Sequence, residues 1–169
     1  MKTKKISFIL LALFISANCF SQNETSLPCQ DKGISDAQFF RVNCVARYKD
    51  KEKSKEQSKI FAKKKMGQQI DSVMKIVLDN YTSQFNEAKA KDIKKAFKNL
   101  MPDFEKQELK FLKIVCQKSD KNKDGKFETY TALEVSKDEY LRNLGSKIMA
   151  NKNLKEDYDE SKFRALIQK

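Results

Sequence analysis

The 169-residue sequence contains no histidine and no tryptophan. Histidine supplies most acid–base groups near neutral pH and many zinc ligands, so its absence excludes the usual forms of both chemistries. The chain also lacks a glycine-rich phosphate loop, a Cys-x-x-Cys pair and a Gly-x-Ser-x-Gly motif. We therefore expect a protein without enzymatic activity and without a cofactor.

Long apolar runs are missing after the first twenty residues. The one such run covers residues 6–17 and follows a basic start with Lys2, Lys4 and Lys5. Twelve helical residues rise about 18 Å, which is too short for the roughly 30 Å hydrocarbon core of a bilayer. The pattern predicts a removable signal peptide over residues 1–21 and an exported protein, either periplasmic, associated with the outer membrane, or secreted.

Two processing routes fit this N-terminus. Cleavage after Ser21 would place Cys19 and Ser21 at the small-residue positions and leave Gln22 first. The alternative is lipid attachment at Cys19, which would anchor the protein at a membrane surface. Ser16 and Asn18 depart from the residues usual before a lipidated cysteine, so simple cleavage is favoured.

Cysteine is scarce, and three cysteines remain after cleavage: Cys29, Cys44 and Cys116. An exported protein can form disulfides, and an odd count leaves at least one thiol unpaired in the monomer. Cys44 and Cys116 lie in two predicted strands, so a disulfide between them and a pair of buried thiols both fit. With no histidine to activate it, a catalytic cysteine is not expected.

Acidic residues are outnumbered by basic ones, 23 against 35, which gives a net charge of +12. For an exported protein this balance favours envelope proteins or anionic envelope polymers, including lipid headgroups, as partners. Nucleic acid is not expected as a partner. The alternative is that most lysines lie among acidic residues on helix faces and only keep those faces solvated.

The N-terminal half of the predicted mature chain begins with polar residues 22–36, which we interpret as a flexible leader. Alternating apolar residues over 40–48 predict a half-buried strand. A capping box at Ser54–Gln57 and apolar residues recurring at three and four predict a long amphipathic helix. A second helix carries Ile93 and Phe97 and is expected to stop or kink at Pro102.

The C-terminal half predicts two strands, over 109–117 and 127–135, joined by a turn ending in Asp124-Gly125. A capping box at Ser136 opens another helix, and the charged tail over 151–169 carries apolar residues for a short final helix. The order predicts one α+β domain over residues 37–150. Its small antiparallel sheet, one strand plus a C-terminal hairpin, is packed by a long amphipathic helix and shorter helices.

The hairpin turn contains the one metal-like motif, in which Asp120, Asn122 and Asp124 alternate and Gly125 follows. This spacing matches the first half of a calcium-binding EF-hand loop. The twelfth position is Thr131 instead of a bidentate glutamate, and strands flank the loop where helices are required. A tight turn built from the same residue types is the favoured interpretation, and a secreted calcium-dependent binding module is the alternative.

A second alternative is a hydrolase that uses carboxylates alone. The tail contains an acidic cluster, Glu156, Asp157, Asp159 and Glu160. Two carboxylates at a suitable separation can perform acid–base catalysis. Lysines at 155 and 162 surround the cluster, so a solvated surface is favoured over a catalytic pair.

Several segments together resemble the twenty-kilodalton outer-membrane lipoprotein family, which is related to the N-terminal domain of a flagellar assembly protein. The segments are Phe39-Phe40-Arg41, Ser58-Lys59 followed by Ala62, Met66 and Ile70, and Phe127 to Glu134. The resemblance spans residues 37–150 and implies a small α+β envelope domain, often lipid-anchored, without catalytic residues. We therefore expect a non-enzymatic cell-envelope protein that acts as a binding or scaffolding module.

Overall fold

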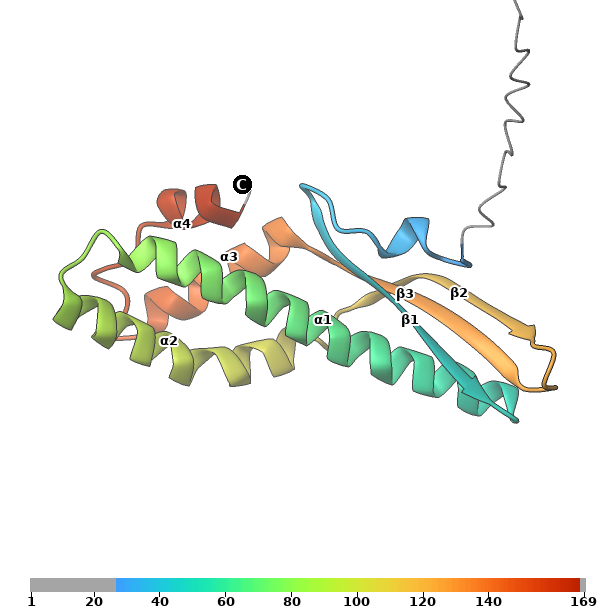
Figure 1. Ribbon diagram of the computed structural model, residues 1–169. Helices are drawn as coiled ribbons and strands as arrows, with labels where there is room; N and C mark the ends of the chain where they lie inside the picture. The colour runs from blue at the N-terminus through green and yellow to red at the C-terminus, as the bar shows by residue number, and fades with distance from the viewer. Residues whose placement is uncertain (1–26, 168–169) are drawn as a thin grey trace, which may run out of the picture.

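The computed structural model describes residues 27–167 (Figure 1). They form a short 3₁₀ turn, three strands and four α-helices. In chain order these are η1 (Asp31–Gly33), β1 (Phe39–Tyr48), α1 (Lys51–Thr82), α2 (Glu87–Glu108), β2 (Lys113–Lys121), β3 (Phe127–Ser136), α3 (Lys137–Ala150) and α4 (Glu160–Ile167). The predicted fold class is confirmed: a small antiparallel sheet is packed by one long helix and several shorter ones.

The sheet has the strand order β1-β3-β2, with β3 in the middle and antiparallel to both neighbours. β1 pairs with β3 without interruption from Phe39 opposite Ser136 to Tyr48 opposite Phe127. The β2–β3 hairpin contains an irregularity between Ile114 and Cys116. Because successive residues of a strand point to opposite faces, this register decides which side chains meet the helices.

Helix α1 crosses one face of the sheet and continues well beyond it (Figure 1). Its N-cap is Asp50, whose side chain accepts a hydrogen bond from the Lys53 amide, so the expected capping box at Ser54 is wrong. Ser54 lies inside the helix and donates to the carbonyl oxygens of Ala46 (2.9 Å) and Phe127 (3.0 Å). Its hydroxyl joins the helix to two strands instead of starting the helix.

Helix α2 begins at Glu87, with Asn86 as its N-cap, and runs through Pro102 to Glu108. A stop at Pro102, one of the two outcomes expected there, is therefore wrong. Pro102 and Lys98 are both exposed, so water can hydrate the Lys98 carbonyl that a proline four residues later cannot bond. Because α2 is longer than expected, β2 starts at Lys113 instead of residue 109.

Residues 27–36 lie against the face of the sheet opposite α1. Cys29 is buried and forms a disulfide with Cys116. Gly33 approaches the sheet so closely that an added Cβ would lie 2.3 Å from the Cβ of Asn43. This part of the predicted flexible leader is thus packed onto the domain.

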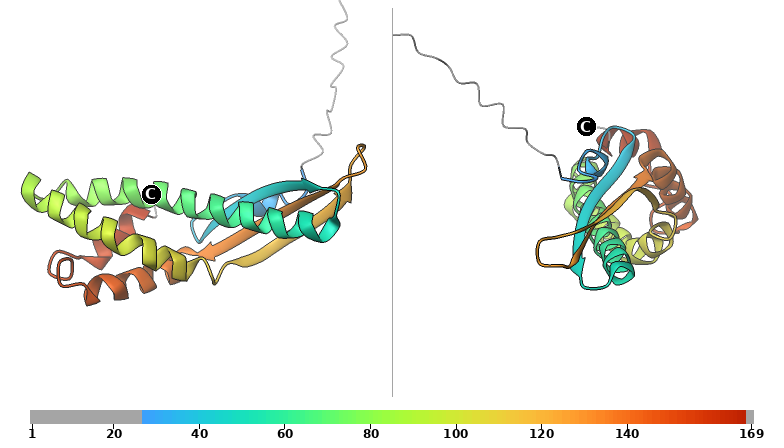
Figure 2. Two further views of the ribbon diagram at one scale, coloured as in Figure 1. Left: turned by 90° about the horizontal axis from the view of Figure 1, so that it is seen from below. Right: turned by 90° about the vertical axis from the view of Figure 1, so that its right-hand side faces the viewer.

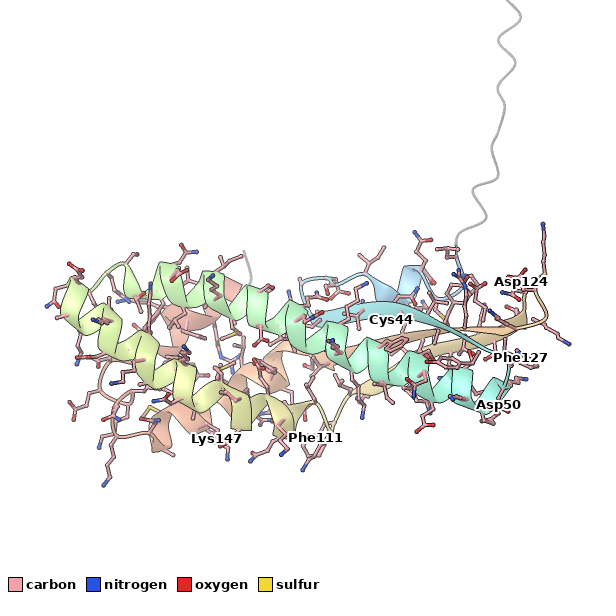
Figure 3. All side chains as sticks on the ribbon, turned by 60° about the horizontal axis from the view of Figure 1, so that its bottom comes forward. Cys44, Asp50, Phe111, Asp124, Phe127 and Lys147 are labelled. Atoms are coloured by element: carbon pink, nitrogen blue, oxygen red, sulfur yellow. A yellow bond between two sulfur atoms is a disulfide. The ribbon has the colours of Figure 1, made fainter. Side chains whose placement is uncertain are left out.

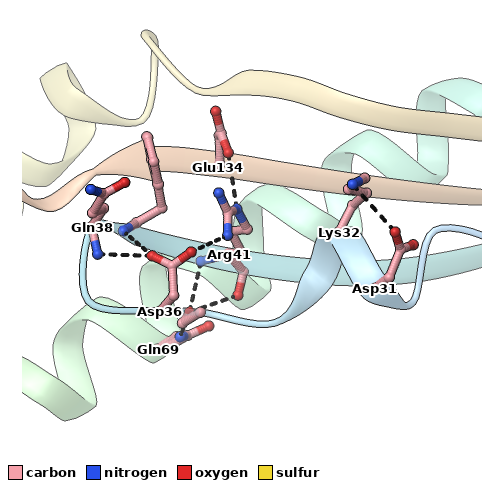
Figure 4. Close-up of polar contacts among 9 residues, drawn as sticks. Asp31, Lys32, Asp36, Gln38, Arg41, Gln69 and Glu134 are labelled. Carbon is pink, nitrogen blue, oxygen red and sulfur yellow. Dashed lines mark hydrogen bonds and ion pairs between the residues drawn. The ribbon is translucent and has the colours of Figure 1, made fainter.

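The junction between this segment and β1 is held by polar contacts (Figure 4). The Arg41 guanidinium pairs with both Asp36 and Glu134. The Ser35 hydroxyl contacts the backbone nitrogen and oxygen of Arg41, and Gln69 of α1 donates to the same hydroxyl at 2.7 Å. The segment is therefore bonded to β1, to α1 and, through the Arg41–Glu134 pair, to β3.

The molecule is elongated, with the sheet at one end and packed helices at the other (Figure 2). We call residues 39–67 and 113–136 the sheet half, and residues 68–112 and 137–167 the helix half. Helix α1 is shared by both. No helix within residues 27–167 combines the length and apolar character needed to cross a membrane.

The C-terminal tail belongs to the helix half. Ser136 is confirmed as the N-cap of α3, because its side chain accepts from the Glu139 amide at 3.3 Å, which is one of the two bonds of the predicted capping box. The Tyr81 hydroxyl donates to the Asp157 carbonyl (2.6 Å) and accepts from the Asp159 amide (2.7 Å). Phe163 of α4 is fully buried, so the tail through residue 167 completes the hydrophobic core.

Candidate binding groove

A groove of about 740 Å³ lies between the second half of α1 and helix α2. These two helices run side by side at the end of the molecule away from the sheet (Figures 1 and 2). The apolar side chains that line the groove come from both helices: Met74, Leu78, Phe97, Met101 and Pro102. Its size and its mainly apolar walls are typical of a site for a small molecule.

The rim of the groove carries charged side chains of both signs. Lys94 and Asp79 form an ion pair at 2.6 Å, and the hydrogen bond from Lys94 lowers the pKa of Asp79. Lys75 and Lys98 are exposed and have no ion-pair partner within residues 27–167. Two cationic side chains are thus available to an anionic group bound at the rim.

Asp71 and Glu105 face each other across one end of the groove. Burial of Glu105, together with the neighbouring Asp71 carboxylate, raises the pKa of Glu105 to about 8. A carboxyl group with that pKa is mostly protonated at neutral pH and can donate a hydrogen bond. Its Oε1 atom is buried without a hydrogen-bond partner in the described part of the chain.

Tyr140 of α3 lies behind this carboxyl pair. Its ring is fully buried, and its hydroxyl has no hydrogen-bond partner among residues 27–167. Burial, then the nearby carboxylates of Glu105, Asp71 and Glu108, raise the pKa of Tyr140 above its usual range. Glu108 itself accepts from the Asn143 amide at 3.2 Å. This end of the groove therefore combines the exposed carboxylate of Asp71 with two buried polar atoms that have no partner in residues 27–167, Glu105 Oε1 and the Tyr140 hydroxyl.

Neither of the two states considered for Cys44 and Cys116, a disulfide between them or a pair of buried thiols, is the one found. Cys116 pairs with Cys29, and Cys44 carries a free thiol. Cys44 is opposite Thr131 and Cys116 is opposite Ala132, which are consecutive residues of β3. The two cysteines therefore point to opposite faces of the sheet, Cys44 toward α1 and Cys116 toward η1. Burial raises the pKa of the Cys44 thiol.

The metal-like motif forms the turn of the β2–β3 hairpin. Asp120 belongs to β2, opposite Glu128, and Asp124 lies at the exposed tip (Figure 3). The Asn122 side chain accepts from the amides of Asp124 (3.1 Å) and Lys126 (3.0 Å), and Gly125 has a positive φ of 74°. Asn122 thus holds the tight turn. Within residues 27–167 no group of three His, Cys, Asp or Glu side chains is arranged to hold a metal ion.

The acidic cluster of the tail is divided among separate ion pairs. Asp157 pairs with Lys89 (2.8 Å), Asp159 with Lys162 (3.6 Å) and Glu160 with Arg164 (2.7 Å). A hollow of about 440 Å³ beside Glu156 and Asp157 is also lined by three lysines: Lys89, Lys95 and Lys152. The surroundings are mixed in charge and do not form an acidic cleft.

The groove was not identified from the sequence. Met74, Leu78, Phe97 and Met101 belong to the apolar stripes that predicted two amphipathic helices, and such stripes usually pack into a core. Whether two helices pack closely or leave a groove depends on their separation, which the periodicity does not specify. The facing carboxyl groups of Asp71 and Glu105 are 34 residues apart and form no local motif. The predicted lipidation site, Cys19, and the predicted signal peptide lie outside the described residues.

Comparison of the chain with protein-family models, curated proteins and solved structures yields no match. The resemblance to the outer-membrane lipoprotein family thus stays a prediction from the residues quoted for it.

Proposed function

We propose that this chain is a non-enzymatic binding module of the cell envelope, and that its groove binds an amphiphile with one acyl chain and an anionic head. The observation that carries the proposal is the groove of about 740 Å³ between α1 and α2, with apolar walls and two unpaired lysines, Lys75 and Lys98, among the charged residues of its rim. An acyl chain would lie against the apolar walls and leave the head at the rim. Export, predicted from the N-terminus, would bring the protein to membranes that contain such molecules.

The charges at the rim favour an anionic head over a cationic one. Lys75 and Lys98 have no ion-pair partner in residues 27–167, whereas Asp79 is already paired with Lys94. Glu105, with a pKa of about 8, is mostly neutral at pH 7 and repels an anion less than a carboxylate would. With Glu105 neutral, the three lysines of the lining outnumber the carboxylates of Asp71 and Asp79, so the net attraction is toward negative charge.

The two other functions considered from the sequence have less support. The oxygen of Asn122 that a calcium site would need holds the hairpin turn instead. Three of the four carboxylates of the tail cluster, those of Asp157, Asp159 and Glu160, are in ion pairs with lysine or arginine side chains. Neither group of residues lines the groove, and we propose neither function.

Isothermal titration calorimetry with oleate, below its aggregation concentration, tests the proposal. We expect one saturable site in the parent protein. Met101→Glu places a charge in the apolar wall and should weaken oleate binding at least tenfold, because it costs more than about 1.4 kcal/mol to bury a charge beside an acyl chain. Met149→Glu is the matched control, since Met149 is an exposed methionine of α3 that does not line the groove.

A second pair of measurements tests the role of the rim. Lys75→Gln with Lys98→Gln should weaken binding of oleate and leave binding of uncharged monooleoylglycerol unchanged. Both lysines are exposed, so this variant is expected to fold even if Met101→Glu does not. Absence of saturable oleate binding, or binding unaffected by both the wall and the rim substitutions, would contradict the proposed function.

A further inference from the structure

Positive charge is concentrated in the sheet half. Residues 39–67 and 113–136 contain 15 Lys and Arg against 7 Asp and Glu. The other described residues contain 16 Lys and Arg against 15 Asp and Glu. The excess of positive charge in the described chain therefore lies almost wholly at the end of the molecule away from the groove.

Within the sheet half, three lysines without an ion-pair partner in residues 27–167 lie on the outward side of α1, and others lie on the β2–β3 hairpin: Lys113, Lys118, Lys121, Lys123 and Lys126. We call Lys53, Ile60, Phe61, Lys63 and Lys64 the basic face. Lys53, Ile60 and Lys64 are spaced by seven and four residues and so share one side of the helix, with Lys63 and Phe61 beside them. All three lysines are exposed, and none has an ion-pair partner in residues 27–167.

The opposite face of the sheet also carries two exposed lysines without an ion-pair partner in residues 27–167, Lys113 and Lys118. Its arginines are paired across the strands, Arg41 with Glu134 and Arg47 with Glu128. On α1, Glu52 pairs with Lys55 at 2.7 Å. Glu56 is exposed, three residues after Lys53 and four before Ile60, so it lies on the same side of the helix and partly offsets the charge of the basic face. Unpaired cations alone therefore do not single out the basic face, and its apolar side chains are the distinguishing feature.

Two large apolar side chains are exposed among these lysines. Ile60 is 48% exposed and Phe61 is 41% exposed, and they are consecutive in the helix. A single exposed apolar residue is common, but an adjacent pair next to unpaired lysines is the arrangement of helices that lie in a lipid interface. Lysines approach anionic headgroups, and the apolar side chains enter the boundary between headgroups and acyl chains.

We propose that the basic face binds an anionic membrane surface, with Ile60 and Phe61 inserted among the headgroups. This inference is independent of the groove, which lies in the other half of the molecule. It requires that α1 lie flat on the membrane through its first four turns. The groove at the far end would then stay open to the surrounding water.

Flotation with lipid vesicles tests the inference, using phosphatidylcholine alone and phosphatidylcholine mixed with phosphatidylglycerol. Lys63→Gln with Lys64→Gln should weaken binding to the anionic vesicles about thirtyfold, because each lysine near such a surface contributes about a fivefold factor. Lys106→Gln with Lys147→Gln removes the same charge from exposed positions of the helix half and should change binding by less than about threefold. Residues 1–26 are the same in all these variants, so any vesicle binding by that segment cancels when the variants are compared with one another.

The apolar pair distinguishes a membrane from a soluble polyanion. Ile60→Ser with Phe61→Ser should remove the part of vesicle binding that survives high salt, while Ile76→Ser, at another exposed apolar position of α1, should not. Equal losses from the Lys63/Lys64 and Lys106/Lys147 variants would overturn the inference. It would also be overturned if Ile60→Ser with Phe61→Ser left vesicle binding unchanged and polyphosphate bound as tightly as the vesicles.

Discussion

Helix α1 makes two different interfaces along its length. In the sheet half it presents hydroxyl groups: Ser58 Oγ lies 2.6 Å from Thr131 Oγ1, which also accepts from Gln117 Nε2 at 2.9 Å. In the helix half it presents apolar and aromatic side chains, among them Val77 and Tyr81. One continuous helix is thus bonded to the sheet by the hydroxyls of its first turns, Ser54 and Ser58, while apolar side chains from Ala62 onward form most of its remaining interface.

This difference indicates a division of roles. Hydroxyl pairs bind the helix to particular residues of the sheet, and a slip of one residue would leave them buried without partners. The aromatic cluster around Phe163 is less directional and contributes mainly through buried area. We infer that the sheet half specifies the alignment of α1 and that the helix half supplies more of the stability. The four predictions below test this comparison, from the largest expected effect to the smallest.

The largest effect is expected for Phe163→Ala in the helix half. The ring is fully buried and lies 5.6 Å from the ring of Phe97 and 5.4 Å from that of Tyr81. Its removal should lower the free energy of unfolding by about 3–5 kcal/mol, measured by urea denaturation. Phe111→Ala is the control, since Phe111 is 69% exposed (Figure 3) and should cost well under about 1 kcal/mol. Similar losses for both would refute the assignment of the core.

In the sheet half, a large effect is expected from the disulfide that joins Cys29 of residues 27–36 to Cys116 of β2. Replacing Cys29 and Cys116 together by serine should lower the free energy of unfolding by about 2–4 kcal/mol, because the bond joins residues 87 apart and restricts the unfolded chain. A reducing agent should destabilise the parent protein by a similar amount and leave the double variant unaffected. If the reducing agent had no effect on the parent protein, residues 27–36 would not be held by this bond.

The hydroxyl contacts should give a smaller effect. Ser58→Ala leaves the Thr131 hydroxyl with Gln117 alone and should cost about 1–2 kcal/mol. A double-mutant cycle with Thr131→Val measures the coupling between the two hydroxyls, which we expect to be at least about 0.5 kcal/mol. Additive losses in the cycle would show that the two side chains contribute independently and that the bond does not align the helix.

The smallest effect concerns Glu105 and depends on pH. Its pKa in the folded protein is about 8, above the usual 4.5, so the folded state binds the proton more tightly than the unfolded state. The contribution of this group to stability is therefore greatest below pH 4.5 and declines as the pH rises through 8. Glu105→Gln should raise stability on the order of 1 kcal/mol at pH 9 and have little effect at pH 4.

Thermal unfolding of both proteins across this pH range measures the difference. A stability difference independent of pH would show that the Glu105 carboxyl does not titrate differently in the folded state. Asp103→Asn, at an exposed neighbouring acidic residue of α2, serves as a control for the loss of one negative charge.

Much of the fold follows from local patterns in the sequence. Period-two alternation over 40–48 and 127–135 predicted two strands that the structure contains as β1 and β3. The cap at Ser136 and the turn ending in Gly125 depend on neighbouring residues alone, and both predictions agree with the structure. Such features are determined by residues within one or two turns of each other.

Features that depend on distant residues were predicted less well. The disulfide partner of Cys116 depends on which face of the sheet each cysteine occupies, and that requires the register of β3 against both neighbours. Helix α2 tolerates Pro102 because this side of the helix meets water, which is a consequence of tertiary packing. The groove depends on the separation of α1 and α2, and no periodicity in either helix encodes that distance.

The central claim is that the helix half binds an amphiphile in the groove between α1 and α2. NMR amide shifts recorded during titration with monomeric lysophosphatidylglycerol test it directly. The account predicts that the largest shifts fall on Met74 to Leu78 of α1 and on Phe97 to Met101 of α2, with little change in β2 and β3. Shifts confined to the sheet half, or no saturable shifts at all, would contradict it.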